Sequence, residues 1–245
     1  MSTKRTGMEG IAPGGAARGR VPSQRKGVEQ AKQRRNAMLV GLTGGLAMGK
    51  STVRRMVEEE LEAVFDADEA VHSLYRQDRA AHLVEHEFPG VRSERGEVDR
   101  AELAKRVVGD DDALRRLECV VHPLVAEQRA EFVRECEQEG RSLCFLEVPL
   151  LFETGAQSDV HEVVVVSTED EVEQRRRALQ RPGMTHEKVD AILRRQLPDN
   201  ERRARADHLI NTVQPVERTR ACVSNLLASL KQKARRLART GSSSD

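Results

Sequence analysis

A glycine-rich segment constrains the fold of this chain more than any other feature of its sequence. Residues 44–51 read Gly-Gly-Leu-Ala-Met-Gly-Lys-Ser and match the pattern G-x-x-x-x-G-K-[ST] once in 245 residues. The pattern requires a strand before it and a helix after it. The chain supplies both, as a short apolar run over 38–43 and apolar residues at helical spacing over 51–61. We therefore predict a phosphate-binding loop at the start of an α/β domain.

The residue types in this loop predict how ATP would be held. Glycines let the backbone turn tightly, so that N–H groups and the helix N-terminus face phosphate oxygens. Lys50 would neutralise the β- and γ-phosphates, the Ser51 hydroxyl would coordinate Mg²⁺, and Thr52 can add a phosphate contact. The predicted ATP-binding residues of the loop are Gly44, Gly45, Ala47, Met48, Gly49, Lys50, Ser51 and Thr52.

Short apolar runs alternate with helical patterns along the rest of the chain, which is typical of a parallel sheet. The predicted strands are 38–43, 63–65, 143–146, 161–167 and 208–210. Further helices are expected over 169–181, from the N-cap Thr185, and from about 215 onward. We expect an α/β fold, a P-loop NTPase core with a mostly parallel five-stranded sheet flanked by helices, within a kinase domain over 38–215. A C-terminal helix and tail would follow over 216–245.

A long charged helical stretch, from Glu69 to Gly140, separates the second and third predicted strands. We predict breaks in it at Pro89-Gly90, at Gly96, at the acidic residues 110–112 and at His122-Pro123. Such an insertion favours helices that cover a substrate. The predicted domain therefore has a helical substrate-binding region at about 69–140 and a lid at about 177–200.

Composition limits the remaining possibilities. Residues 1–37 are predicted to be a disordered basic extension, because positions 1–36 carry nine Lys and Arg against two Glu and few large apolar side chains. Over the whole chain 41 basic and 40 acidic residues nearly cancel and Trp is absent, which disfavours nucleic-acid binding. The sequence has no apolar run of the roughly 20 residues that a membrane span needs. We expect a cytoplasmic protein without membrane contact, and nothing points to an obligate protein partner.

Two aspartates follow the second predicted strand, at the edge where open α/β sheets place their ligands. Asp66 or Asp68 could orient or deprotonate an acceptor hydroxyl. The same two residues could instead cap a helix that begins near Glu69. Spacing alone leaves both interpretations open.

The chain from Met38 to about Thr212 resembles the dephospho-CoA kinase family, whose members perform the last step of coenzyme A synthesis. The segments that carry the resemblance are 40–52, Asp66-Ala67-Asp68, His122-Pro123, Pro149–Glu153, the valines 163–166, and Arg177 and Arg181 before Met184-Thr185. The loop alone occurs in many kinases, whereas the ordered set is specific to this family.

The resemblance implies transfer of the ATP γ-phosphate to the ribose 3′-hydroxyl of dephospho-CoA, with Mg²⁺ as cofactor. It implies that Asp68 is the catalytic base and that Arg181, with Lys50, acts on the transferring phosphate. Arg177 would contact the nucleotide from the lid. Substrate-binding roles are implied for Asp66, as a loop-ordering or Mg²⁺-water partner, and for His122, although His122-Pro123 can equally end a helix.

Three positions depart from the family pattern. Leu61-Glu-Ala63 stands in place of Gly-Ala-Pro, His72 in place of an arginine, and Asn211-Thr212 in place of Asp-Asn near the adenine. Glu147 follows an apolar strand where many P-loop proteins carry an aspartate, and it could help to hold Mg²⁺.

Two alternatives remain open. Another small-molecule P-loop kinase, for a nucleoside, shikimate or gluconate, would share the loop, but the segments Asp66–Asp68 and Pro149–Glu153 argue against it. A GTPase is disfavoured because no N-K-x-D motif follows the loop. A binding protein that grips RNA or a partner with its basic extension is the other possibility, and the intact Lys50-Ser51 pair argues against it.

Overall fold

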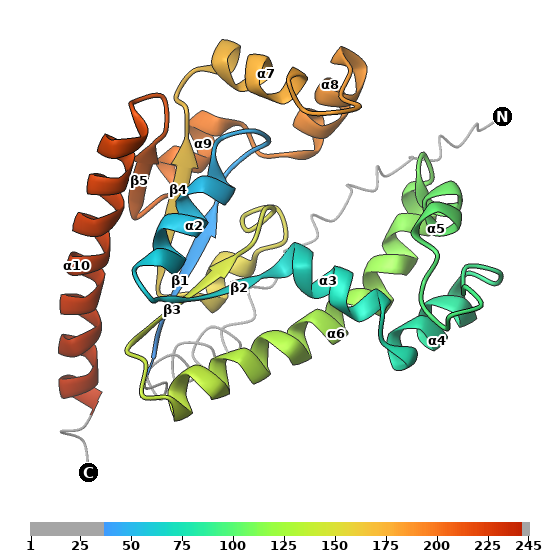
Figure 1. Cartoon of the computed structure of the whole chain (residues 1–245), viewed down its shortest axis with the longest axis horizontal. Helices are drawn as coiled ribbons and strands as arrows, with labels where there is room; N and C mark the ends of the chain where they lie inside the picture. The colour runs from blue at the N-terminus through green and yellow to red at the C-terminus, as the bar shows by residue number, and fades with distance from the viewer. Residues whose placement is uncertain (1–36, 242–245) are drawn as a thin grey trace, which may run out of the picture.

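The computed structural model describes residues 37–241, and one five-stranded parallel sheet lies at its centre (Figure 1). The strands are β1 (Met38–Thr43), β2 (Ala63–Asp66), β3 (Leu143–Glu147), β4 (Glu162–Ser167) and β5 (His208–Asn211). Their order is β2-β3-β1-β4-β5, and every neighbouring pair is parallel. This arrangement confirms the predicted α/β class, and each strand ends within one residue of its predicted bounds.

The central strand β1 organises two hydrophobic layers because it is buried on both faces. Val40 and Leu42 pack toward α2 (Lys50–Glu59) and α10 (Val216–Gly241), whereas Leu39 packs toward α6 (Asp111–Gln138). Ala37, which the sequence placed in the basic extension, is buried in the second layer. Residues 1–36 lie outside the described part of the chain.

The parallel sheet brings the carboxyl ends of its strands to one edge. The loop after β1, Asp66 at the end of β2 and Glu147 at the end of β3 meet there, since β3 lies between β1 and β2. Open parallel sheets bind ligands in this position. The fold thus places the residues singled out from the sequence on the same side of the molecule.

A separate helical layer extends from the sheet. It consists of α3 (Ala67–Tyr75), α4 (Asp78–Glu87), α5 (Arg100–Val107) and the first half of α6, and it has its own core around Val84, Phe88, Leu117 and Val121. The second half of α6 packs Val133 and Cys136 against the sheet. One long helix therefore belongs to two hydrophobic cores.

The predicted break at His122-Pro123 is wrong, because Pro123 lies inside α6. Proline removes one helical hydrogen bond and usually ends or kinks a helix. Here the apolar residues on either side, Val121 and Leu124, are both buried, and this packing continues the helix through the proline. The predicted break at 110–112 is confirmed, since Asp110 caps the start of α6 by accepting from the Ala113 N–H at 2.9 Å.

Three short helices form the connection between β4 and β5. They are α7 (Glu171–Leu179), α8 (His186–Arg195) and α9 (Asp199–Ala204), and a 3₁₀ helix, η1 (Ala156–Asp159), precedes β4. Thr185 caps α8 as predicted. Helix α7 is shorter than predicted, so that Arg181 lies in the turn after it. Within residues 37–241, no helix has the length and apolar character that crossing a membrane requires.

Candidate active site

The loop between β1 and α2 has the backbone geometry that a phosphate cradle needs. Gly49 adopts φ = +87° directly before α2, a conformation that favours glycine, and a Cβ there would lie 3.1 Å from Thr212 Oγ1. A Cβ on Gly45 would lie 2.3 Å from Nη2 of Arg202, a residue only 2% exposed. Close neighbours behind the loop therefore favour glycine at both positions, and the backbone conformation of the turn also favours it at Gly49.

A cavity of about 490 Å³ opens in front of this loop. It is lined by all of 44–52, and by Arg54, Asp66, Asp68, Glu147, Pro149, Arg177, Arg181 and Gln196. Every residue predicted to bind ATP or to act in catalysis therefore lines one hollow, which we call the loop cavity. The N-terminus of α2 faces it, so the helix dipole and backbone N–H groups favour an anion there.

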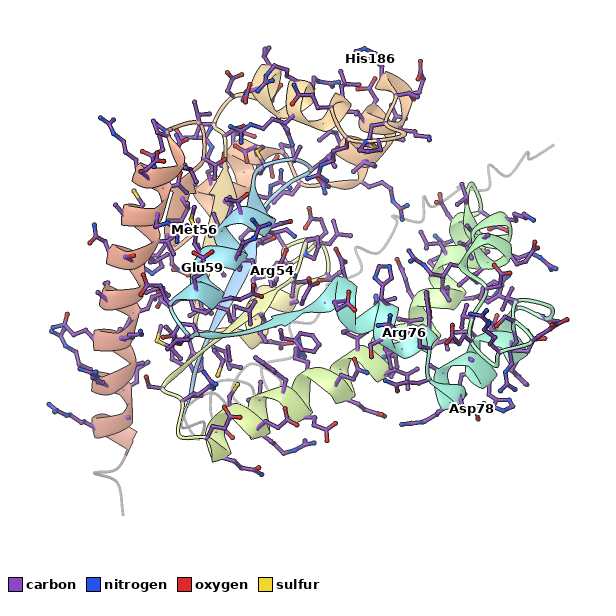
Figure 2. The ribbon with its side chains drawn as sticks, in the orientation of Figure 1. Arg54, Met56, Glu59, Arg76, Asp78 and His186 are labelled. Carbon is purple, nitrogen blue, oxygen red and sulfur yellow. The ribbon has the colours of Figure 1, made fainter. Side chains whose placement is uncertain are left out.

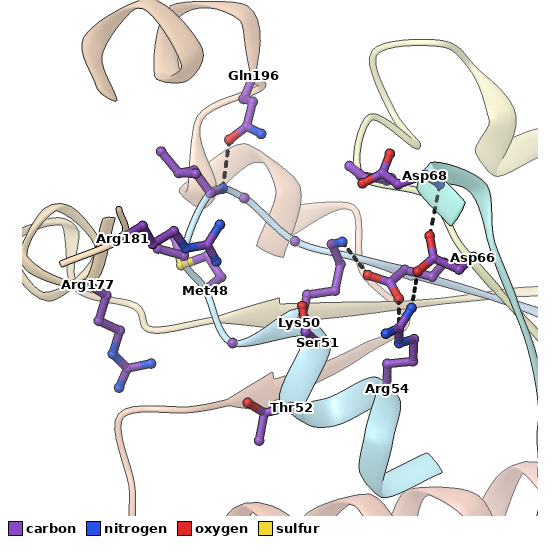
Figure 3. A pocket seen from close by; sticks show the side chains of 17 residues that line it. Met48, Lys50, Ser51, Thr52, Arg54, Asp66, Asp68, Arg177, Arg181 and Gln196 are labelled. Carbon is purple, nitrogen blue, oxygen red and sulfur yellow. Dashed lines mark hydrogen bonds and ion pairs between the residues drawn. The ribbon is translucent and has the colours of Figure 1, made fainter. Parts of the chain in front are cut away.

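An ion-pair chain crosses the floor of the loop cavity (Figure 3). Lys50 Nζ lies 2.5 Å from Glu147 Oε1, and Glu147 Oε2 lies 3.4 Å from Arg54 Nε. Arg54 in turn donates to Asp66. Arg54 leaves α2 on the side of β2, away from the buried Met56 (Figure 2). Lys50 is thus paired with a buried carboxylate in this structure, and Arg54 is a site residue that the sequence analysis did not identify.

Asp66 and Asp68 have different roles in the structure. Asp66 Oδ1 accepts hydrogen bonds from the N–H groups of Asp68 and Glu69 at 2.9 and 3.1 Å, so Asp66 is the N-cap of α3. The capping interpretation therefore holds for Asp66, with a helix that begins at Ala67. Asp68 lies in the first helical turn with an exposed side chain, and Figure 3 shows its carboxylate across the loop cavity from Lys50.

A second cavity, of about 770 Å³, lies between α3, α6 and the segment after β3. We call it the helical cavity. Its walls are largely apolar, with Phe65, Val71, Val125, Leu150 and Ile192, and its cationic side chains are Arg129 and Arg195. His122 also lines it. Three residues, Asp68, Pro149 and Gln196, line both this cavity and the loop cavity. Asp68 therefore stands where the two hollows meet.

Two arginines reach the loop cavity from α7 and the turn that follows it. Arg177 donates to the Thr212 side chain at 3.2 Å and to the Thr212 carbonyl at 2.9 Å. Thr212 Oγ1 donates to the Met48 carbonyl at 2.8 Å. Arg177 is therefore connected to the loop through Thr212. Arg181 lines the same cavity with an exposed side chain.

The carboxylate of Glu173 orients Arg177, and its titration gives a pH test. Hydrogen bonds from Arg176, at 2.7 and 2.8 Å, and from Arg177, at 2.6 Å, lower the pKa of Glu173 from 4.5 to about 2. Because the folded pKa is depressed, these contacts are complete above pH 4.5 and are lost as pH falls toward 2. We expect the Glu173 carboxyl signal in NMR to titrate near pH 2, and Arg176→Ala to move the midpoint toward 4.5. An unmoved midpoint would contradict this origin of the shift.

Two glutamines hold the loop at Leu46, and nothing in the sequence pattern identified them. Gln196 Oε1 accepts from the Leu46 N–H at 2.9 Å, and Gln174 Nε2 donates to the Leu46 carbonyl at 2.9 Å. The Leu46 and Ala47 side chains also pack with Ala178 on α7. The helices of the predicted lid are thus fastened to the phosphate-binding loop.

The donor set fits a magnesium ion that arrives with a nucleotide. Among residues 37–241, no group of three or more His, Cys, Asp or Glu side chains could hold a metal by itself. Ser51 lines the loop cavity at the start of α2, and the buried Glu147 Oε2 has no hydrogen-bond partner in the described structure. Oxygen ligands of this kind suit Mg²⁺, which commonly takes one or two protein ligands plus substrate phosphates.

These features define a class of protein. A strand, a G-x-x-x-x-G-K-S loop and a helix facing an anion cavity, with a carboxylate at the junction to a second cavity, are typical of a P-loop kinase. A family model described as dephospho-CoA kinase matches residues 38–216. The chain belongs to the dephospho-CoA kinase family, and it is a kinase that phosphorylates a small molecule with ATP.

Relatives agree with this assignment, and solved structures share the fold. A dephospho-CoA kinase of Brucella abortus is 45% identical over 196 residues, which cover 80% of this chain and 96% of that protein. One of Mesorhizobium japonicum is 48% identical over 194 residues, with 79% and 97% covered. A crystal structure of a Thermus thermophilus protein has a TM-score of 0.68 at 32% identity, with 79% and 98% covered. The Campylobacter jejuni dephospho-CoA kinase, at 23% identity and a TM-score of 0.57 with 80% and 97% covered, supports the fold alone.

Proposed function

We propose that the protein transfers the γ-phosphate of ATP, bound in the loop cavity, to the ribose 3′-hydroxyl of dephospho-CoA, bound in the helical cavity. The observation that carries this proposal is the position of Asp68, which lines both cavities. A phosphoryl transfer needs donor and acceptor in line with a group that receives the hydroxyl proton. Family membership supports the choice of acceptor.

The phosphoryl transfer can be written with the residues at the junction of the two cavities. The acceptor oxygen attacks the γ-phosphorus, the bond between that phosphorus and the β–γ bridging oxygen breaks, and ADP leaves. The proton of the hydroxyl passes to the Asp68 carboxylate. Asp68 is exposed in the described structure, so it is accessible to a substrate in either cavity. General bases of this kind contribute about 10²- to 10⁴-fold to a rate.

Lys50 has to change partners when ATP binds. Its ammonium pairs with Glu147 in the structure, at 2.5 Å, and we propose that it turns to the β- and γ-phosphate oxygens. Arg181 and Arg177 would add charge from the side of α7, where planar guanidinium groups suit phosphate oxygens. The cost of leaving Glu147 without Lys50 is reduced because Arg54 stays beside it, 3.4 Å away.

Ser51 and Glu147 would hold Mg²⁺, Ser51 through its hydroxyl and Glu147 through Oε2, which accepts no hydrogen bond in the described structure. When bound, the ion offsets the negative charge that develops on the phosphate oxygens. Asp66 is better described as the residue that orders the start of α3 and holds Arg54. We propose that it acts on the reaction only by positioning Asp68.

The two helical regions of the domain would bind different substrates. We propose that the region of about 69–140 binds dephospho-CoA, with His122 at the helical cavity, and that about 177–200 is the lid over ATP. The apolar walls of the helical cavity suit an uncharged chain such as pantetheine, and Arg195 suits a phosphate. Arg129 pairs with Asp159 at 2.9 Å and would have to change partner to bind one. Because ATP is the donor, we place the reaction in the cytoplasm.

Purified protein should phosphorylate dephospho-CoA at the 3′-hydroxyl in the presence of ATP and Mg²⁺. The assay should offer adenosine, shikimate and gluconate as competing acceptors, with phosphorus NMR to locate the new phosphate. Turnover confined to dephospho-CoA would support the proposal. Preference for another acceptor would retain the P-loop kinase and reject the substrate.

A further inference from the structure

Gln196 stands at the junction of the two cavities. It follows the last residue of α8 and is half-buried, and it lines both the loop cavity and the helical cavity. Among the residues that the structure describes, it shares this position only with Asp68 and Pro149. Pro149 offers no side-chain hydrogen bond. Gln196 and Asp68 are therefore the two polar side chains that face both a donor and an acceptor.

One hydrogen bond fixes the orientation of the Gln196 carboxamide. Its Oε1 accepts from the Leu46 N–H at 2.9 Å. A backbone N–H can only donate, so the oxygen of the amide must face Leu46 and the NH₂ group must face away from it. No hydrogen bond from Nε2 occurs within residues 37–241. In Figure 3 this nitrogen lies on the side of the carboxamide toward Asp68.

The loop holds this amide firmly. Leu46 is fixed from its other side by Gln174, whose Nε2 donates to the Leu46 carbonyl at 2.9 Å, and Gln174 is buried. Leu46 and Ala47 also pack against Ala178 and Val189. A donor that is held in place before the reaction needs no reorganisation when charge develops, which is the condition for effective transition-state stabilisation.

We propose that Gln196 is a further catalytic residue, whose Nε2 donates a hydrogen bond to the phosphoryl group as it passes from ATP to the acceptor. This inference rests on the proposed function. The charge of the transferring group is spread over its three equatorial oxygens. Lys50, Arg177 and Arg181 line the loop cavity but not the helical cavity, so they approach those oxygens from the ATP side. Gln196 supplies a neutral donor at the junction itself.

The test compares two alanine variants that each remove one amide hydrogen bond to the same residue. Gln196→Ala and Gln174→Ala both loosen Leu46, but Gln174 lines neither cavity. If Gln196 donates to the phosphoryl group, Gln196→Ala should lower kcat by about 10²-fold, the loss typical of one such donor. Gln174→Ala should lower kcat much less, and the KM for ATP should rise similarly in both.

Gln196→Glu removes the Nε2 donor but keeps the hydrogen bond that supports Leu46. A carboxylate still accepts from the Leu46 N–H but cannot donate from the other side. We expect this variant to keep the thermal unfolding midpoint near that of the unaltered protein, while kcat falls by about 10²-fold or more, because the donor is lost and the added carboxylate repels the phosphates. Because it keeps the loop contact, it also serves if Gln196→Ala does not fold.

Two outcomes would overturn the inference. Equal kcat losses for Gln196→Ala and Gln174→Ala would make Gln196 a support of the loop only, and so would an unaltered kcat in Gln196→Glu. These failures differ from a failure of the proposed function, in which the unaltered protein itself would not phosphorylate dephospho-CoA.

Discussion

Replacing Asp68 by asparagine should lower kcat for phosphorylation of dephospho-CoA by about 10²- to 10⁴-fold. Asparagine keeps the size of the side chain but cannot accept the hydroxyl proton. Asp68 is exposed and lies in the first turn of α3, so the fold should tolerate the change. Steady-state kinetics with both substrates, together with urea unfolding, would measure the two effects. The KM for ATP should change little.

Asp66→Asn is the matched control. Asparagine is as good an N-cap as aspartate, so α3 should keep its start, and only the ion pair with Arg54 is lost. We expect a kcat loss well below that of Asp68→Asn. If the two variants lost activity equally, or if Asp68→Asn kept normal turnover, the assignment of the base to Asp68 would be wrong.

Lys50→Ala should have two separable effects. Loss of the ammonium removes the charge that faces the phosphates, and we expect kcat/KM for ATP to fall by about 10²- to 10³-fold. The change also leaves the buried Glu147, whose side chain is 5% exposed, without its 2.5 Å partner. Arg54 remains nearby, so the free energy of unfolding should fall by about 1–3 kcal/mol.

Adding Glu147→Gln to Lys50→Ala would distinguish these effects. The double variant has no unpaired carboxylate, so its free energy of unfolding in urea should recover most of the loss. Its activity should stay low, because the phosphates still lack Lys50. Recovery of activity in the double variant would show that Lys50 acts through Glu147 and not on ATP.

The fold could be predicted from the sequence because the signals that determine it are local. The apolar run at 38–43 and the valines at 163–166 became central strands because consecutive apolar residues allow a strand to be buried on both faces. The glycine loop could be placed between a strand and a helix because its motif and the apolar patterns on either side of it are also local signals. Its close neighbours Arg202 and Thr212 could not be predicted, since more than 150 residues separate them from the glycines that they contact.

The candidate site was predictable only in part. Local motifs predicted the loop, Asp66 and Asp68, the family resemblance added Arg177 and Arg181, and the structure brings them to one cavity. Arg54 and Gln196 were missed because a lone polar residue in a helix or directly after one carries no pattern, and their partners come from other elements. The break predicted at His122-Pro123 was wrong because tertiary packing on both sides of Pro123 outweighs the local preference of proline.

The long helix α6 also restricts how the length of this sequence can vary. Its first half belongs to the core of the helical layer and its second half to the core beneath the sheet. Each residue of a helix turns the chain by about 100°. Deletion of one residue between Leu124 and Val133 would rotate one apolar face away from its core, whichever half kept its place. Surface loops tolerate insertions and deletions, but this segment should keep a constant length wherever both cores are retained.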